Sequence, residues 1–285
     1  MPYYLIAVLC GILLLIIFLF SPGDFPKSAD KRLWAHSYAH RGLHTKDKTV
    51  PENSLAAFGL AAEAGYGIEL DLNLTTDNRV VVFHDDSLTR VCGVEKKVAE
   101  CTYEDLACYP LQETNERIPL LEEVLGLVDG RVPLIVELKA TKRNDELCRR
   151  AVELLDSYHG PYCIESFHPG IVRWFRKNRP AVVRGQLSAG LRNYKGLPFW
   201  QGLMLSSLLT NAATRPHFVA YRHEDARRPI LDLYRFLGGR LVGWTVRDTD
   251  PIAYCQKRFD IIIFEFFLPA ASGEKKALSS PTATV

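Results

Sequence analysis

The chain has 285 residues and a formal net charge of +2, and 47% of its residues are hydrophobic. This length fits one domain of roughly 200–250 residues with short additions at its ends, and the hydrophobic content is sufficient for a sizeable core. The near-neutral charge, together with the lack of a dense run of Lys and Arg, argues against a nucleic-acid partner.

The N-terminal segment, residues 3–20, contains no charged side chain and is rich in Leu, Ile and Phe. A bilayer-spanning helix needs roughly 17–25 such residues. A signal peptide would have a basic start and a small-x-small cleavage site, and both are missing. The sequence therefore favours an uncleaved membrane anchor that comprises residues 1–21. The membrane is accordingly a predicted partner. Lys27, Lys31 and Arg32 follow the segment, so the positive-inside rule favours a cytoplasmic location for the rest of the chain.

The remaining chain is expected to contain a linker at residues 22–34, a globular domain at residues 35–270 and a disordered tail at residues 271–285, which is small and polar. The seven cysteines are scattered and form no CxxC pair. We therefore expect reduced and mostly buried thiols. A disulfide between Cys92 and Cys101, or between Cys101 and Cys108, stays open as the alternative for a domain outside the cell.

Segments with strand and helix patterns alternate along the globular domain, which is typical of a parallel sheet. Strands are predicted at residues 37–40, 67–72, 80–84, 134–139, 162–167, 182–187, 217–221, 241–246 and 261–264. Helices are predicted at residues 53–62, 120–128, 145–158, 169–178, 228–237 and 250–257.

Eight parallel strands would close a barrel of roughly 250 residues, one strand fewer than the number predicted. Residues 75–78 form a short turn-like cluster, so the strand at residues 80–84 is expected to pair antiparallel with the one before it. Residues 85–119 have little periodicity and are predicted to form an insertion above the barrel mouth. A doubly wound sheet is the second choice, because no Gly-rich phosphate loop follows the first strand.

Carboxylates recur on two of the predicted strands. Glu69 and Asp71 are two residues apart and therefore face the same way, and Glu137 and Lys139 repeat this spacing. A carboxylate in an apolar strand costs several kcal/mol unless it is paired or binds a metal. Three such carboxylates suit one divalent cation with oxygen ligands, Mg²⁺ or Ca²⁺. The alternative is a structural salt bridge, for example between Lys139 and Glu69.

Two histidines, His40 and His84, end predicted strands, and both are followed by charged residues. This arrangement fits general acid and base chemistry. Arg41 can hold a phosphate through two hydrogen bonds, and Gly42 is expected to end the strand and turn Arg41 inward.

Three further residues are candidates for the site. Glu52 and Asn53 precede a predicted helix, where Asn53 is expected to be the N-cap and where a helix N-terminus can also bind phosphate. Trp244 either walls the pocket or fills the core. The other histidines have no evident partners and are interpreted as surface or core residues; they are His36, His44, His159, His168, His217 and His223.

These motifs, taken in order, resemble the glycerophosphodiester phosphodiesterase family over nearly the whole globular domain. The resemblance rests on the motifs at residues 40–42, 51–54, 68–71, 82–85, 118–123, 136–139, 166–167 and 243–246. It implies a TIM (β/α)₈ barrel, an α/β fold, with a small insertion after the second strand. It also implies release of sn-glycerol 3-phosphate and an alcohol from glycerophosphodiesters.

The resemblance further implies a role for each candidate residue. Glu69, Asp71 and Glu137 would bind the metal, with Glu52 beside it. His40 and His84 would be the acid–base pair, and Arg41 and Lys139 would bind the phosphate. The glycerol 2-hydroxyl would attack phosphorus, and water would then open the cyclic phosphate.

The last strand departs from the family pattern, because Phe264-Glu265-Phe266-Phe267 stands where family members often carry Asp or Asn before a proline. The additional aromatic residues are compatible with a lipid-like leaving group or with a membrane contact. Two alternatives to the glycerophosphodiesterase remain. One is a lysophospholipase D that cleaves lysophospholipids, which the membrane anchor motivates because it places the site near lipid. The other is a catalytically inactive, membrane-tethered binding protein.

Overall fold

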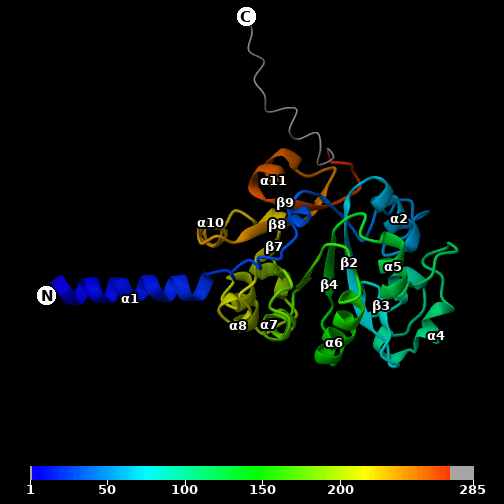
Figure 1. Ribbon diagram of the computed structural model, residues 1–285, viewed down its shortest axis with the longest axis horizontal. Helices are drawn as coiled ribbons and strands as arrows, with labels where there is room; N and C mark the ends of the chain where they lie inside the picture. The colour runs from blue at the N-terminus through cyan, green and yellow to red at the C-terminus, as the bar shows by residue number, and fades with distance from the viewer. Residues whose placement is uncertain (1, 270–285) are drawn as a thin grey trace, which may run out of the picture.

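Eight parallel strands close into a barrel in the computed structural model, which describes residues 2–269 (Figure 1). The barrel strands are β1 (Tyr38–His40), β2 (Gly67–Leu74), β4 (Leu134–Leu138), β5 (Tyr162–Ser166), β6 (Arg184–Ser188), β7 (Phe218–Arg222), β8 (Arg240–Arg247) and β9 (Ile261–Glu265). β1 pairs with both β2 and β9, which closes the sheet. The barrel prediction is confirmed, and the doubly wound alternative is wrong because such a sheet stays open.

The extra strand and the insertion lie on one side of the barrel. β3 (Val80–Val82) pairs antiparallel with β2, as predicted. The insertion contains α3 (Thr89–Cys92), η2 (Val98–Glu100) and α4 (Tyr103–Ala107). Its side chains form a small core of their own, which includes Val91, Leu106 and Ile118. This core explains how a segment without clear periodicity keeps a defined structure.

The outer layer consists of helices in the connections between strands. The predicted helices are present as α2 (Leu55–Glu63), α5 (Leu121–Val128), α6 (Asn144–Leu155), α7 (Pro169–Asn178), α10 (Pro229–Phe236) and α11 (Ile252–Arg258). The connection from β6 to β7 adds η3 (Leu191–Tyr194), α8 (Phe199–Ser206) and α9 (Asn211–Thr214), and η4 (His223–Asp225) follows β7. No helix was predicted between β6 and β7, because α8 carries apolar residues on its exposed side and so has no amphipathic pattern.

Alternation along β2 separates the core from the site. Ile68, Leu70 and Leu72 pack in the main hydrophobic cluster with outer-layer residues such as Phe58 and Leu121. Glu69 and Asp71 lie between them in the sequence, are also buried, and face the other way. The barrel interior therefore has to accommodate charged groups near its carboxyl end.

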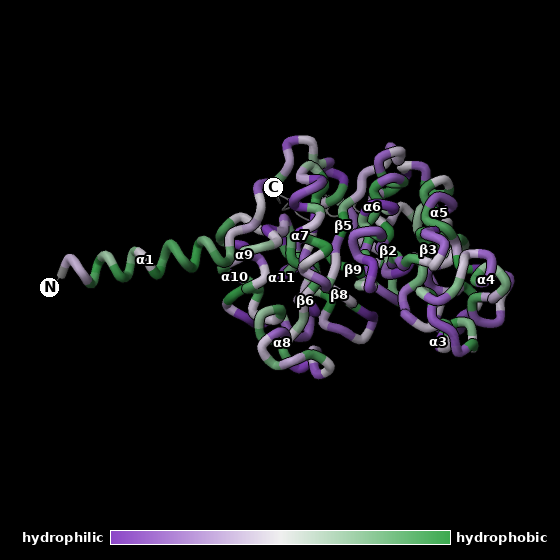
Figure 2. The backbone as a smooth tube through the Cα atoms, turned by 90° about the horizontal axis from the view of Figure 1, so that it is seen from below, coloured by the Kyte–Doolittle hydropathy of each residue, from purple (hydrophilic) through white to green (hydrophobic). Residues whose placement is uncertain are grey.

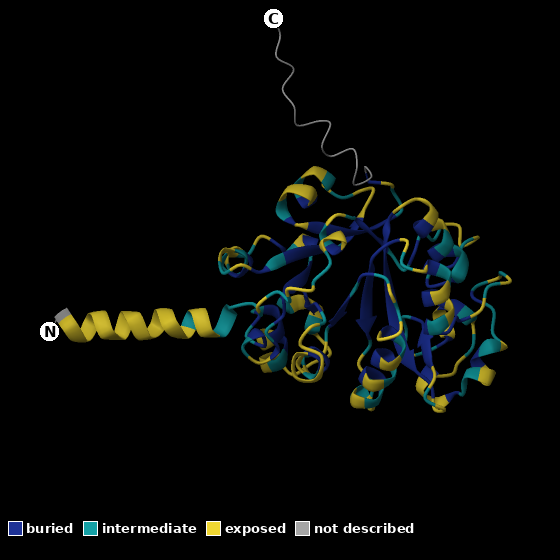
Figure 3. Ribbon diagram, viewed as in Figure 1, coloured by how far each residue is buried: buried dark blue, intermediate teal, exposed yellow. Residues whose placement is uncertain are grey.

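The N-terminal helix α1 (Pro2–Phe20) projects from the barrel domain (Figure 1), is apolar along most of its length (Figure 2) and is exposed (Figure 3). Its length and composition suit a membrane span, and a signal sequence at this position would have the same properties. Its domain end lies beside α9. The predicted linker, residues 22–34, lies against the barrel: the Gly23 amide donates to the Pro216 carbonyl at 3.0 Å, and Leu33 is buried.

All seven cysteines, each within residues 2–269, are free, and Cys101, Cys148, Cys163 and Cys255 are buried. Neither of the two disulfides left open by the sequence is therefore formed. The predicted tail at residues 271–285 lies outside the described residues.

Candidate active site

One cavity of about 210 Å³ gathers most of the predicted site residues at the carboxyl end of the barrel strands. Its lining includes His40, Arg41, Glu69, His84, Glu137, Lys139 and Trp244. Barrel enzymes place their active sites at this end, where the βα loops converge.

Three buried carboxylates form the centre of the site. One oxygen from each of Glu69, Asp71 and Glu137 lies within 4.8 Å of the others, a spacing that can hold a metal ion. Burial, followed by the charges of Asp71 and Glu137, raises the pKa of Glu69 well above its usual value. Burial likewise raises the pKa of Glu137 to about 7, although Lys139 opposes it.

Lys139 and Arg41 supply positive charge to this cluster. The Lys139 ammonium lies 2.8 Å from both Asp71 and Glu137, so the salt bridge considered as the alternative is formed with these two carboxylates and not with Glu69. Burial alone would raise the pKa of Asp71, but Lys139 and Arg41 outweigh it and hold that pKa well below the usual value. Burial raises the pKa values of Glu69 and Glu137 in spite of these cations, so a further positive charge would be needed to stabilise both carboxylates in their ionised form. Oxygen ligands of this kind fit a hard divalent cation.

Backbone geometry turns Arg41 into the site, as predicted. Arg41 and Gly42 have φ values of 56° and 80°, so β1 ends at His40 and the chain reverses its direction. The Arg41 guanidinium then reaches Glu52 at 2.7 Å and Asp71 at 3.2 Å. A side chain at position 42 would also collide with Ala57, since its Cβ would lie 2.8 Å from the Ala57 carbonyl carbon. Glycine is therefore required next to Arg41.

The prediction that Asn53 is the N-cap of the helix is wrong. Ser54 is the N-cap of α2, and its hydroxyl accepts from the Ala57 amide at 3.1 Å. Asn53 has a φ of 54°, and its side-chain amide donates to Asp71 at 2.8 Å. The buried Asp71 carboxylate needs hydrogen-bond donors, and Asn53 supplies one while Ser54 caps the helix.

The insertion contributes Arg90, which sequence reasoning missed. Arg90 forms two hydrogen bonds with Glu52, at 2.6 and 2.8 Å, and one with Asp85 at 2.7 Å. Burial would raise the pKa of Glu52, but Arg90 and Arg41 hold it at about 2. Asp85 in turn lies 2.5 Å from His84 Nδ1. A single insertion residue therefore holds both Glu52 and the carboxylate that orients His84.

Glu265, at the end of β9, connects two histidines and was also missed. Its Oε1 lies 3.4 Å from His40 Nδ1 and 3.0 Å from His44 Nε2, and its Oε2 lies 2.7 Å from Arg247. The interpretation of His44 as a residue without a partner is therefore wrong. His40, His44 and Glu265 are also close enough to hold a metal, but Arg247 already supplies a cation there, and we interpret the group as a support for His40. The sequence feature that could have identified Glu265 is an acidic residue at the end of a predicted strand.

Two more side chains complete the cavity wall. Trp244 packs edge-on against Phe167, with ring centroids 5.4 Å apart, and its buried indole N–H has no partner within residues 2–269. Glu165 lies opposite Glu137 in the β4–β5 register, and burial raises its pKa well above the usual value. Like β2 and β4, β5 carries an acidic residue on a barrel strand. It carries only one, so the sequence lacks the repeated spacing that singled out the residues of β2 and β4.

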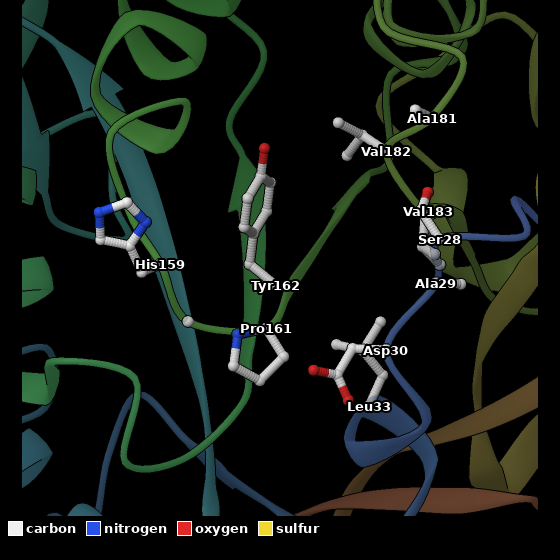
Figure 4. A pocket seen from close by; sticks show the side chains of 11 residues that line it. Ser28, Ala29, Asp30, Leu33, His159, Pro161, Tyr162, Ala181, Val182 and Val183 are labelled. Atoms are coloured by element: carbon white, nitrogen blue, oxygen red, sulfur yellow. The ribbon is translucent and has the colours of Figure 1, made fainter.

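The other histidines have local contacts away from the cavity. His168 accepts from the Gly170 amide at the start of α7, and His217 accepts from the Arg184 amide. His223 pairs with Asp250 at 3.1 Å. His159 lines a separate cavity of about 260 Å³ between residues 28–33 and the starts of β5 and β6 (Figure 4). That cavity lies at the amino end of the barrel, opposite the candidate active site.

Acidification is expected to destabilise the fold partly through His40. Burial, followed by the charge of Arg41, lowers the pKa of His40 to about 4. Between about pH 4 and about pH 6.5, the His40 imidazole binds a proton in the unfolded chain but not in the native protein. The free energy of unfolding therefore falls as the pH falls through this window, by at most about 3 kcal/mol.

Urea unfolding at pH 7 and pH 4.5 tests this expectation. The variant His40→Asn should lose less stability on acidification than the wild type. The matched variant His159→Asn, at an exposed position, should behave like the wild type. An equal loss in all three proteins would contradict the role given to His40.

Comparisons with known proteins identify the family of the chain. Residues 40–263 match the family model described as the glycerophosphoryl diester phosphodiesterase family. A glycerophosphodiester phosphodiesterase of Bacillus altitudinis is 33% identical over 157 residues, which are 51% of this chain and 63% of that protein. A lysophospholipase D of Homo sapiens is 29% identical over 171 residues, which are 55% of this chain and 52% of that protein. The aligned residues thus span less than two thirds of either relative.

Solved structures show the same fold. A phosphodiesterase of Oleispira antarctica, solved with the product sn-glycerol 3-phosphate, superposes with a TM-score of 0.68 at 20% identity, covering 86% of this chain and 97% of that one. The family model covers well over half of the sequence, and the chain therefore belongs to the glycerophosphoryl diester phosphodiesterase family.

Proposed function

We propose that this protein hydrolyses glycerophosphodiesters to sn-glycerol 3-phosphate and an alcohol, using one divalent cation, Mg²⁺ or Ca²⁺. The observation that carries the proposal is that Glu69 and Glu137 line one cavity together with two cationic side chains and two histidines, and that Asp71 is clustered with these two glutamates. Family membership and the product-bound structure of a protein with the same fold support it. Every position expected for catalysis is filled, which argues against an inactive binding protein.

In this proposal Glu69, Asp71 and Glu137 hold the cation. When bound, the cation would polarise the phosphate oxygens and stabilise the charge that develops on them. Arg41 and Lys139 would orient the phosphate beside the carboxylates that they contact. The unpaired Trp244 indole N–H would donate to an oxygen of the substrate.

The two histidines would move the protons. His40 is neutral at physiological pH, because burial lowers its pKa to about 4, and it can therefore accept the proton of the attacking 2-hydroxyl. His84 would donate a proton to the leaving alcohol. Burial lowers the pKa of His84 as well, and the hydrogen bond with Asp85 opposes that shift and favours the protonated form. Water would then open the cyclic phosphate, with the two roles exchanged.

A release assay with the detergent-solubilised full chain tests the proposal. Its substrates are glycerophosphocholine, glycerophosphoethanolamine and glycerophosphoglycerol, and the product measured is sn-glycerol 3-phosphate, with and without EDTA. Metal-dependent release from at least one substrate is expected. Release that EDTA leaves unchanged would remove the cation from the mechanism, and no release would remove the reaction itself.

Glu265 is proposed as a positioning residue for His40. Glu265→Gln should lower kcat roughly 10–100-fold, by analogy with the loss of a carboxylate that orients a metal-binding histidine. Glu265 opposes the lowering of the His40 pKa by burial and by Arg41, so the loss of its charge should lower that pKa further. The acid limb of the pH–rate profile should therefore move to lower pH in the variant. A fall in kcat with an unmoved acid limb would instead indicate a merely structural role.

We further propose that α1 anchors the protein in a membrane, with the barrel on the cytoplasmic side. The support is the apolar composition of α1 and the basic residues Lys27, Lys31 and Arg32 after it. Protease accessibility of the domain in sealed, right-side-out vesicles measures the orientation, and cleavage without permeabilisation would contradict a cytoplasmic domain.

The similarity to a lysophospholipase D makes lysophospholipids the second candidate substrate.

A further inference from the structure

A second, apolar cavity lies beside the candidate active site. It has a volume of about 730 Å³, and its walls include Phe167, Tyr194, Leu197, Trp200, Met204 and Leu205. Most of these side chains come from the β6–β7 connection, in and around α8. We call this cavity the α8 groove. Its size is typical of pockets that hold small organic ligands.

The α8 groove is adjacent to the cavity of the candidate active site, which we call the catalytic cavity. Phe167 lines both of them, and in the catalytic cavity it packs against Trp244. Ala140, which lines the groove, directly follows Lys139, one of the proposed phosphate-binding residues. A substrate with its phosphate at Lys139 could therefore extend an apolar chain past Phe167 into the groove.

The outer face of the same segment is unusually apolar for a protein surface. Phe199 and Trp200 are 71% and 60% exposed, and Leu197, Leu203 and Met204 are also exposed. The exposed cations Arg192 and Lys195 precede them. Aromatic and aliphatic side chains next to basic residues are characteristic of segments that lie in a lipid interface.

This apolar face lies on the side of the barrel from which α1 projects. α1 contacts α9, which follows α8 after four residues, and both Figure 1 and Figure 2 show α8 on this side. α10 lies on the same side and exposes Phe236. If α1 enters a membrane, the mouth of the groove is close to the lipid from which a substrate would come.

We propose that the α8 groove binds the acyl chain of a lysophospholipid whose phosphodiester lies in the catalytic cavity. The inference rests on the proposed function and deepens it by assigning the substrate class and its binding residues. The 2-hydroxyl oxygen attacks phosphorus, the bond from phosphorus to the head-group alcohol breaks, and that alcohol leaves with a proton. Water then opens the cyclic phosphate, which gives an acylated glycerol 3-phosphate.

This chemistry also specifies where the acyl chain is attached. The 3-position carries the phosphate and the 2-hydroxyl must be free to attack, so only the 1-position can carry the chain. The substrate class is therefore 1-acyl glycerophosphodiesters, and lipids with two acyl chains are excluded.

Substrates that differ only in acyl length test the proposal. Glycerophosphocholine is compared with 1-hexanoyl, 1-octanoyl and 1-decanoyl lysophosphatidylcholine, all below their micelle concentrations, on the full chain in detergent-free nanodiscs. The value of kcat/KM is expected to rise with chain length, by up to roughly fourfold for each methylene that leaves water. The lipid with two hexanoyl chains should not be cleaved.

Two neighbouring residues of α8 provide a matched pair of variants. Met204 lines the groove and Leu203 does not, while both are on the same helix and similarly exposed. Met204→Gln should flatten the dependence on chain length and leave turnover of glycerophosphocholine unchanged, and Leu197→Gln in the groove wall should do the same. Leu203→Gln should keep the wild-type dependence.

The outcomes separate this inference from the proposed function. If glycerophosphocholine is cleaved but acyl length has no effect, the groove assignment is wrong and the proposed function stands. A chain-length dependence that Met204→Gln and Leu197→Gln leave intact would also overturn it and leave the groove to another occupant. If no substrate is cleaved, both proposals fail.

Discussion

Replacing His40 or His84 with alanine is expected to lower kcat for glycerophosphocholine by roughly 10²–10⁴-fold, the usual contribution of a positioned acid or base. Both side chains line the catalytic cavity, and each has a carboxylate at its Nδ1, Glu265 for His40 and Asp85 for His84. The two changes should not add fully, because the histidines act on the same proton transfers. Steady-state kinetics of the two single variants and of the double variant measure the effect.

The control is His159→Ala, which removes an exposed histidine at the opposite end of the barrel. It should retain wild-type kinetics, and the thermal unfolding of all variants should show that they fold. Near-normal activity of either active-site variant would remove that histidine from the mechanism.

Replacing Glu69 with glutamine is expected to abolish metal binding and to lower activity by about 10³-fold. This corresponds to the several kcal/mol that a metal ion supplies to a transition state. Burial and the neighbouring charges of Asp71 and Glu137 raise the pKa of Glu69, so the neutral amide resembles the form that this site favours without a cation. The fold should therefore survive, which makes this variant more informative than a change at Asp71, on which Lys139 and Arg41 both depend.

Glu165→Gln is the matched control for Glu69→Gln. Glu165 is also buried, also lines the cavity and also has a raised pKa, but it is not one of the three clustered ligands. Titration calorimetry with Mg²⁺ and Ca²⁺ should show that metal binding is lost in Glu69→Gln and retained in Glu165→Gln. Equal metal affinities in the two variants would contradict the assigned ligand set.

The sequence predicts the barrel well, because its strands are short apolar runs separated by amphipathic helices. The antiparallel pairing of β3 with β2 follows from a connection that is too short for a helix. Helix α8 could not be predicted in this way, because Phe199 and Trp200 are apolar yet exposed. A periodicity argument assumes that apolar residues face the core, and this assumption fails for a surface that has another partner.

For the site, repeated spacing was informative and single residues were not. Glu69 with Asp71, and Glu137 with Lys139, stand out because two polar groups recur on one strand face. Glu265, His44 and Arg90 each stand alone in the sequence, and only the closed barrel and the folded insertion bring them to His40 and Glu52. Asn53 had two reasonable roles, and the choice depended on the position of Asp71, which lies on another element.

The central claim is that one cation at the three carboxylates is required for phosphodiester hydrolysis. The most direct measurement is to strip the full-length protein with EDTA, add back Mg²⁺ or Ca²⁺ in steps, and follow release of sn-glycerol 3-phosphate from glycerophosphocholine. We expect no release from the stripped protein and a recovery that follows a single-site binding curve in the wild type. Undiminished release from the stripped protein, or equal recovery in Glu69→Gln, would contradict the claim.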